Sequence, residues 1–354
     1  MLEQEKGIAM MSHNKSIRDV EKLEDILSEP TEATIQAMGS IEGDLLFLGV
    51  GGKMGPTLAR MAKKASDLAN VSRRVIGVSR FSEPQLEARL RSWGIETHAC
   101  DLLDRTSYAR LPDAANVVYM AGMKFGSTGQ ESLTWAMNTF LPGLVCEKYR
   151  HSRIAAFSTG NVYGLSPVSL GGSREGDPLH PIGEYAVSCL GRERIFEHFS
   201  RTNQIKMSIV RLNYATELRY GVLSDLAQRV FSGDTVSLRM GHFNSIWQAD
   251  AAAMSLQALS YASAPPVVIN IAGPELLSVR RIAEEFGDYF GKTPHFEGVE
   301  SEDSLLSNAQ KAFHLFGYPQ VSLGQMMVWI ADWVGRGGKT FAKPTHFENR
   351  AGNF

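Results

Sequence analysis

Apolar residues follow two kinds of spacing, which alternate along the chain. Short continuous apolar runs, typical of strands buried on both faces of a parallel sheet, precede stretches with an apolar residue every three or four positions, typical of helices. The predicted strands are residues 45–50, 74–78, 95–99, 116–121, 154–158 and 206–211. The predicted helices that connect them are residues 56–68, 83–93, 131–150 and 184–200. This alternation predicts β-α-β units, and hence an α/β protein with a doubly wound parallel sheet.

The pattern differs on both sides of this region. Residues 1–42 show helical spacing from Ser16 to Leu27 and an N-cap residue for a second short helix at Thr31. Beyond Asn213 the alternation is looser, and residues 336–354 have little core-forming pattern. The helices predicted in this C-terminal part are residues 221–232, 249–261, 279–290, 304–316 and 323–334, and the short strands are residues 236–238 and 267–270.

The charge balance narrows the range of partners. The sequence has 354 residues, with 36 Lys and Arg against 38 Asp and Glu, and a net charge of −2. Such a balance argues against a nucleic-acid platform and against a polybasic membrane-binding protein. The charge is uneven, because residues 1–45 carry a net −6 and the remainder a net +4. The positive remainder suits a ligand that carries phosphate groups.

Cysteine usage and hydropathy indicate a reduced, cytoplasmic protein. Cys100, Cys146 and Cys189 lack metal-ligand spacing and are too few for a disulfide framework. No apolar run approaches the ~20 residues that span a bilayer. The N-terminus lacks the basic start and apolar segment of a signal peptide. The histidines form no cluster, so no metal site is predicted.

A glycine-rich turn joins the first predicted strand to the first predicted helix. Gly49, Gly52 and Gly55 give the pattern G-x-x-G-x-x-G. In a dinucleotide-binding turn the first glycine allows a tight turn, the second lets the backbone approach a pyrophosphate, and the third permits close packing of helix on strand. The N–H groups at the start of the helix would then face the anion. The position of the turn at the head of the β-α-β series predicts an NAD(P) site.

This turn also organises the chain into predicted domains. The strands and helices that follow it would hold the cofactor, and the looser C-terminal part would cover the substrate. The predicted parts are a helical extension over residues 1–42, an NAD(P)-binding Rossmann domain over 43–212 that also receives the helix near 249–261, a mainly substrate-binding domain over 213–335 and a tail over 336–354.

The residues after the second and third strands bear on the choice of cofactor. An acid at the end of the second strand would favour NAD, because it accepts from the ribose 2′-OH and repels a 2′-phosphate. Here the strand runs into Ser79 and Arg80, and Lys53 lies in the turn, so NADP is slightly favoured. The alternative is NAD beside a solvated Arg80 and Lys53. Asp101 is placed either to accept from the adenine amino group or to act as an ordinary helix cap.

With these features the sequence resembles the extended short-chain dehydrogenase/reductases, in particular their NAD-dependent epimerase/dehydratase branch, over residues 44–335. Ala121-Gly122-Met123-Lys124 is similar to the A-G-L-K segment of UDP-galactose 4-epimerases, and residues 158–164 resemble the S-[ST]-x-x-V-Y-G signature. The further matching positions are Asp101-Leu102, Asn138, Tyr185, Arg211-Leu212-Asn213 and Asp250.

The resemblance implies a role for each of these positions. Tyr185 would exchange a proton with the substrate alcohol, and Thr159, with Ser158, would hydrogen-bond the substrate oxygen. The implied cofactor site is Gly49, Gly52, Lys53, Met54, Gly55, Ser79, Arg80, Asp101, Leu102, Ala121, Gly122, Lys124, Asn138, Tyr185 and Cys189. The side chains expected to contact a carbohydrate, by their rings and planar donors, are Asn161, Asn213, Tyr214, Arg219 and Trp247. Relatives of this kind also pair as homodimers through the helices corresponding to 131–150 and 184–200.

The sequence departs from the family at the residue four positions after Tyr185. The family has a lysine there, which lets a tyrosine with an ordinary pKa near 10 work at neutral pH. This chain has Cys189 instead. Either another cation substitutes, with Lys124, Arg192 and the oxidised nicotinamide as candidates, or the reaction needs only part of the acid–base cycle, or the protein binds the cofactor without turnover.

The expected function is therefore an NAD(P)-dependent epimerase or reductase that acts on a sugar or sugar-nucleotide by hydride transfer. Dehydration is not expected, because Gly160 and Asn161 stand where dehydratases of this family carry Asp-Glu. The alternative is a non-catalytic NAD(P)-binding sensor or partner subunit. Intact glycines and Tyr185 favour the enzyme, and Cys189 favours the alternative.

Overall fold

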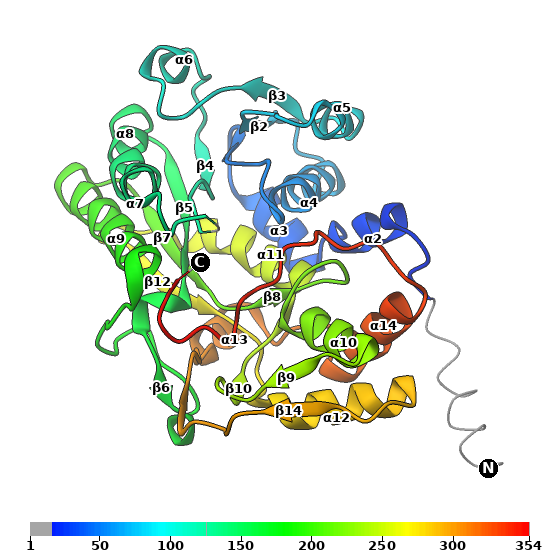
Figure 1. Cartoon of the computed structure of the whole chain (residues 1–354). Helices are drawn as coiled ribbons and strands as arrows, with labels where there is room; N and C mark the ends of the chain where they lie inside the picture. Colours follow the sequence, from blue (N-terminus) through cyan, green and yellow to red (C-terminus); the bar gives the residue numbers. More distant parts are fainter. Residues whose placement is uncertain (1–15, 125, 354) are drawn as a thin grey trace.

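The computed structural model of the protein describes residues 16–124 and 126–353. At its centre lies a seven-stranded parallel sheet with the order β12-β7-β5-β4-β1-β2-β3 (Figure 1). The order reverses between β1 and β4, which confirms the predicted doubly wound α/β fold. The strands of this sheet are β1 (Leu45–Leu48), β2 (Val75–Ser79), β3 (Glu96–Ala99), β4 (Asn116–Tyr119), β5 (Arg153–Thr159), β7 (Met207–Leu212) and β12 (Val267–Ile271).

Helices cover both faces of this sheet, and β1 shows how one strand serves both. Leu45 and Phe47 pack with the core that includes residues of α3, α4 and α11, whereas Leu46 and Leu48 pack with the core that includes residues of α8 and α9. All four side chains are fully buried. The helices concerned are α4 (Gly55–Leu68), α5 (Pro84–Ser92), α6 (Arg105–Ala109), α7 (Glu131–Trp135), α8 (Leu141–Lys148), α9 (Gly183–Asn203) and α11 (Gln248–Gln257).

Two N-terminal helices, α2 (Val20–Leu27) and α3 (Glu32–Ser40), precede the sheet and pack against α4 and α11. Each begins at a side-chain cap, because Asp19 accepts from the Lys22 N–H at 2.7 Å and Thr31 accepts from the Thr34 N–H at 3.1 Å. Glu24 of α2 is buried and contacts both Arg89 of α5 and Arg219 of the C-terminal part, each at 3.1 Å. Helix α2 thereby ties the sheet region to the C-terminal part.

The C-terminal part is built on a separate core of apolar side chains, among which Trp247 and Phe286 are fully buried. Its helices surround short paired strands below the sheet in Figure 1. They are α10 (Val222–Ser232), α12 (Val279–Phe290), α13 (Gln310–Phe316) and α14 (Leu323–Gly335), and the short strands are β6 (Ser166–Pro167), β8 (Ala215–Thr216), β9 (Thr235–Ser237), β10 (His242–Phe243), β11 (Ile246–Trp247), β13 (Leu277–Ser278), β14 (His295–Glu297) and β15 (Asp303–Ser304).

Three differences from the sequence prediction concern helices, and several short strands that were not predicted, among them β8, β10 and β13, form as well. The single helix predicted over residues 131–150 is interrupted by a π-helical segment, Ala136–Phe140. The helix predicted over 304–316 begins only at Gln310, because residues 303–304 pair with β6 instead. The short helix α6 was not expected, and it is capped by Asp104. The late start of α13 follows from pairing with a distant strand and the start of α6 from a local cap, and the spacing of apolar residues predicts neither.

Candidate active site

The glycine turn lies at the carboxyl end of β1, where each glycine meets a different requirement. Gly49 has φ +90°, and a Cβ there would lie 2.7 Å from the Ala121 nitrogen. A Cβ on Gly55 would lie 2.2 Å from the Val50 oxygen, so this glycine brings α4 close to the turn. Gly52 is exposed, and nothing lies within 3.7 Å of its Cβ position. The turn is therefore tight at both ends and open in the middle.

The ends of β2 and β3 flank this turn. Ser79 lies against it, since a Cβ on Gly51 would be 2.4 Å from the Ser79 Oγ. Arg80 is exposed, and no acidic residue stands beside it in the sequence at the end of β2. Asp101 is exposed after β3 and accepts from the Leu103 N–H at 3.1 Å, while Leu102 is buried. The residues predicted to contact the adenosine half of the cofactor thus lie together at the carboxyl edge of the sheet.

Tyr185 lies in the first turn of α9, where its phenol lies beside two side chains that influence its pKa, Thr159 and Cys189. The Thr159 Oγ1 accepts from the Asn161 Nδ2 at 2.8 Å, which holds this hydroxyl in place. Burial, together with Cys189, raises the pKa of Tyr185 well above its ordinary value. The phenol is therefore protonated at neutral pH.

Cys189 is fully buried at the position that the family gives to lysine. Burial raises the pKa of its thiol, although Arg192 and Tyr185 oppose that rise. The thiol therefore stays neutral beside the phenol.

Arg192 provides a buried cation one turn beyond Cys189. Its guanidinium donates to the Asn138 Oδ1 at 2.6 Å and to the Phe157 carbonyl at 2.9 Å, both uncharged oxygens. A Cβ on Gly122 would lie 2.4 Å from the Arg192 Nη2, so the guanidinium reaches the loop that follows β4. Arg192 lies seven residues, or two helical turns, after Tyr185, so both residues lie on the same face of α9. On this face it carries the positive charge nearest to Tyr185 in sequence.

Asn138 holds this arrangement together from the π-helical segment. Its amide nitrogen donates to the Met123 carbonyl at 2.9 Å and to the Ser188 Oγ at 3.0 Å, while its oxygen accepts from the Met123 N–H. The same oxygen accepts from Arg192. Single π-helical turns inside helices occur frequently at functional sites. Here the π turn places one fully buried amide between the β4 loop and α9.

Two lysines approach the site from the cofactor side. Lys124 follows β4, and its Nζ lies 5.7 Å from the centre of the Tyr185 ring. Lys53 belongs to the glycine turn, yet its Nζ lies 3.3 Å from the centre of the Tyr220 ring, in the C-terminal part. Burial lowers the pKa of Lys124 to about 8 and, with repulsion from Lys124, lowers the pKa of Lys53 to about 7. Both amines lie close to their titration point at neutral pH.

Ser158 is one residue from Thr159 but belongs to a different network. Its hydroxyl donates to the Glu193 carboxylate at 2.5 Å, and Glu193 forms a buried ion pair with Arg211 at 2.7 Å. Arg211 also donates to the Tyr163 hydroxyl at 2.8 Å, which donates to Asn270 at 2.7 Å. The structure therefore places Ser158 and Arg211 in the interior behind the site. They hold β5, β7 and α9 together.

The predicted substrate residues separate into two groups. Asn161 and Tyr214 line a small cavity of about 20 Å³ beside Thr159, and Asn213 is buried nearby with its amide directed to the Leu305 carbonyl at 3.4 Å. Trp247 is fully buried in the C-terminal core, with its ring 5.3 Å from Trp329. Arg219 is buried in the ion pairs with Glu217 and Glu24. The structure does not bring Trp247 or Arg219 to the cavity, because the Trp247 ring packs in the core and the Arg219 guanidinium is held in ion pairs.

The same cavity includes residues that sequence reasoning did not select. The residues of the C-terminal segment that line it are His346, Asn349, Arg350 and Gly352. The sequence carries no apolar periodicity or motif there, so only their position in the fold reveals them.

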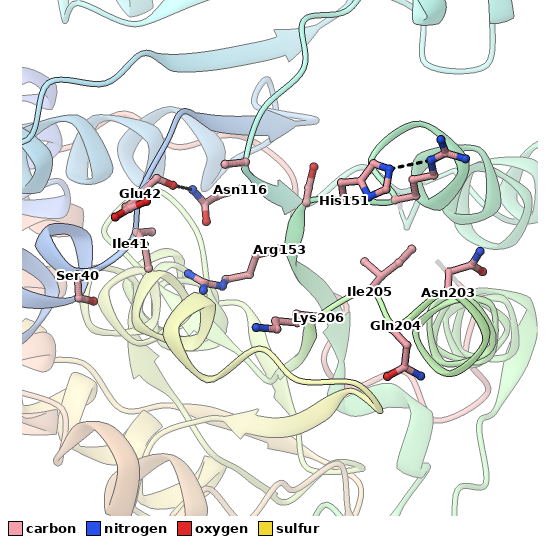
Figure 2. A pocket seen from close by; sticks show the side chains of 13 residues that line it. Ser40, Ile41, Glu42, Asn116, His151, Arg153, Asn203, Gln204, Ile205 and Lys206 are labelled. Carbon is pink, nitrogen blue, oxygen red and sulfur yellow. Dashed lines mark hydrogen bonds between the residues drawn. The ribbon is translucent and has the colours of Figure 1, made fainter.

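A second, larger cavity lies at the opposite edge of the sheet and is shown in Figure 2. It measures about 520 Å³ and is lined by side chains at the amino ends of β4, β5 and β7, among them Asn116, Arg153 and Lys206. Ligands of doubly wound sheets bind beyond the carboxyl ends of the strands, so this cavity is not the candidate site.

Within residues 16–124 and 126–353, no group of His, Cys, Asp and Glu side chains is arranged to hold a metal ion. In the same ranges, no helix combines the length and apolarity needed to cross a membrane.

Comparisons with known proteins agree with this architecture. A model of the NAD dependent epimerase/dehydratase family matches residues 45–236, while no curated protein matches the sequence.

Among solved structures, the UDP-glucuronic acid 4-epimerase from Bacillus cereus, in complex with NAD, is similar with a TM-score of 0.69 and 20% identity, covering 84% of this chain and 100% of that chain. The UDP-glucose 4-epimerase from Thermotoga maritima, with UDP-glucose, has a TM-score of 0.67 and 18% identity, covering 83% and 99%. The dTDP-glucose 4,6-dehydratase from Streptomyces venezuelae, with NAD and TYD bound, has a TM-score of 0.69 and 19% identity, covering 83% and 97%. The family match spans more than half of the chain, which therefore belongs to the NAD-dependent epimerase/dehydratase family of the extended short-chain dehydrogenase/reductases.

Proposed function

We propose that the protein is an NAD(P)-dependent epimerase or reductase that acts on a sugar or sugar-nucleotide by hydride transfer, with Tyr185 as the acid/base. The observation that carries this proposal is the position of the Tyr185 phenol beside the Thr159 side chain and a buried cation, Arg192. Family membership supports the same reaction class.

The glycine turn fits a dinucleotide. Gly52 leaves open space where backbone can approach a pyrophosphate, and the first turn of α4 has no side-chain cap from Met54 to compete for its N–H groups. NAD(P) would supply the hydride donor and acceptor. Exposed Arg80 and the absence of a neighbouring acid at the end of β2 favour NADP, whereas the similar Bacillus and Streptomyces structures contain NAD. We propose that residues 43–212 hold the cofactor and residues 213–335 mainly the substrate.

The side chains around Tyr185 favour proton donation. Because burial raises the pKa of Tyr185, its phenol is protonated at neutral pH and can donate to a carbonyl oxygen of the substrate. The Thr159 hydroxyl, fixed by Asn161, orients that oxygen. In the opposite direction Tyr185 must lose its proton, and the positive charges of Arg192 and Lys124 stabilise the phenolate that results. Asn161, Asn213 and Tyr214 remain the proposed substrate contacts.

A second candidate function rests on Cys189. A neutral thiol cannot replace a lysine charge, and Cys189 raises the pKa of the phenol that would act on the substrate. A protein that binds NAD(P) without turnover, as a sensor or partner subunit, would be compatible with this arrangement.

A homodimer is also proposed, through the outer surface of α7 and the π-helical segment. Trp135 and Phe140 are 38% and 52% exposed there, respectively, whereas Leu144 and Phe196 of the neighbouring helices are buried in the sheet core. Measurement of the solution mass, with Phe140→Glu as the disrupting variant, tests this proposal.

The function is tested by cofactor binding and turnover measured on the same protein. Fluorescence titration with NADH and NADPH gives the affinities, and NMR follows UDP- and dTDP-sugars incubated with the loaded protein. Tyr185→Phe should retain cofactor binding and abolish turnover, while Tyr318→Phe, at an exposed tyrosine outside the site, should change neither. Turnover that survives Tyr185→Phe would contradict the mechanism. Tight cofactor binding with no turnover of any sugar would favour the second candidate.

A further inference from the structure

The C-terminal segment crosses the front of the molecule and returns to α9, as the red trace in Figure 1 shows. Its first anchor is Thr345, whose N–H and hydroxyl both donate to the Asp225 carboxylate, at 2.7 and 2.6 Å. Its second anchor is Phe347, which is 3% exposed and lies beside Phe243 with ring centres 6.2 Å apart. Residues 345–347 are therefore built into the C-terminal core.

Residues 349–352 are held differently, by polar contacts at their ends. Arg350 pairs with the Asp303 carboxylate at 2.5 Å and donates to the Arg239 carbonyl at 3.2 Å. Both side chains of this pair remain partly exposed, so water competes for the contact. At the tip, Gly352 lies directly on Gly183, because a Cβ on Gly183 would be 2.5 Å from the Gly352 oxygen. This contact lies two residues before Tyr185.

The cavity lined by these residues is too small for the proposed substrate. Asn161 and Tyr214 line it together with His346, Asn349 and Arg350. Its volume is about 20 Å³, enough for one water molecule or two. Sites for small-molecule ligands usually measure about 300–1,000 Å³. A sugar can therefore reach Thr159 from this side only if the wall formed by the C-terminal segment moves.

We propose that residues 349–352 are a lid on the substrate pocket, that the Arg350–Asp303 ion pair is its latch, and that Phe347 marks the fixed end from which it opens. This proposal rests on the proposed function, since it assigns the cavity beside Asn161 and Tyr214 to the sugar. When the latch opens, the Arg350 guanidinium is released at the pocket wall, where it can pair with an anionic group of the substrate. Because these residues form the wall, they also limit the size of the sugar that the closed site accepts.

The first test needs no substrate. In a Leu165→Cys variant, a cysteine stands in the cavity wall, and all three natural cysteines are buried. The rate at which a small disulfide reagent labels this cysteine reports lid opening. Adding Asp303→Asn should raise the labelling rate about fivefold, the upper range for a partly exposed ion pair, because it removes the latch charge without changing side-chain size. Adding Glu348→Gln should change the rate less than twofold, since Glu348 pairs with Arg229 at 2.6 Å, outside the cavity.

The second test uses hydrogen exchange of residues 345–353 in the NAD-loaded protein, with and without UDP-glucose and UDP-glucuronic acid. Faster exchange over 349–352 in Asp303→Asn, and slower exchange when a nucleotide sugar is bound, are the expected results. Equal labelling rates and equal exchange in Asp303→Asn and the parent would overturn the lid. If the latch variant opens the cavity but no sugar-nucleotide binds, the lid stands and the proposed substrate class fails.

Discussion

The guanidinium of Arg192 acts electrostatically on the Tyr185 phenol from two turns further along α9. A lysine four residues after the tyrosine would deliver its charge from the adjacent turn, and Cys189 occupies that position here. Arg192 is buried, held on Asn138 and Phe157, and carries its charge at every accessible pH. The helix thus retains a cation on the tyrosine face, displaced by three residues.

If this displaced cation sustains the reaction, Arg192→Gln should lower kcat about 100-fold, the order expected for impaired acid–base catalysis. Glutamine can still hydrogen-bond Asn138 but carries no charge, so the pKa of Tyr185 should rise further. Arg192→Lys should recover part of the loss. Turnover of a sugar-nucleotide as a function of pH provides the measurement, with circular dichroism as the check on folding. A kcat that is unchanged in Arg192→Gln would exclude Arg192 and leave Lys124 and the oxidised nicotinamide as the candidate cations.

Restoring the family lysine, by Cys189→Lys, should destabilise the protein. The new amine would be buried within reach of the Arg192 charge, and an uncompensated buried charge costs about 3 kcal/mol or more. Arg192→Met should partly rescue the stability of the Cys189→Lys variant, because it removes the like charge. Urea unfolding of the two single variants and the double variant gives the coupling between them. A Cys189→Lys variant that is as stable as the parent and turns over faster would show instead that the pocket needs only its lysine.

Much of the sheet could be predicted from the sequence, for a reason that β1 makes clear. Its residues face two cores in turn, so the run is apolar throughout and ends at the glycine turn. Tyr185, Thr159 and Asn138 were also selected from the sequence, because they match positions of the family's motifs. The structure brings Tyr185 and Thr159 close enough for Thr159 to influence the pKa of the phenol.

Side-chain direction in the C-terminal part could not be predicted in the same way. Arg219 and Trp247 have the composition of a carbohydrate site, but the same side chains can equally pack inward, and here they do. Lys53 belongs to the glycine turn, yet its amine lies over Tyr220. The wall residue Arg350 lies in a segment without periodicity, and its place depends on a contact with Asp303 far away in sequence.

The N-terminal helix α2 should contribute to stability through Glu24. This carboxylate is 5% exposed and faces Arg89 and Arg219, so Glu24→Gln removes the charge partner of Arg89 and one of the two carboxylates that pair with the buried Arg219, the other being Glu217. We expect a loss of about 1.5 kcal/mol, the order of a hydrogen bond to a charged group, because Glu217 still compensates the Arg219 charge. Glu21→Gln on the exposed face of the same helix is the matched control and should change stability by less than about 0.5 kcal/mol. Urea unfolding measures both. Equal effects of the two variants would mean that α2 does not link the two parts energetically.

Lys53 should make the stability of the protein depend on pH between neutral and alkaline conditions. Burial, followed by repulsion from Lys124 and Lys343, lowers its pKa from 10.5 to about 7. Between these two values the unfolded chain holds a proton that the folded protein has lost, so the free energy of unfolding rises with pH across this window. Below pH 7 both states are protonated and the folded state bears the full cost of the buried charge.

Lys53→Met removes this cost and should therefore raise Tm most at pH 6, with the gain shrinking towards pH 10. Lys206→Met, at an exposed lysine, should give a Tm difference that does not change over the same range. A gain for Lys53→Met that is equally large at pH 6 and pH 10 would show that its amine is not the group that titrates.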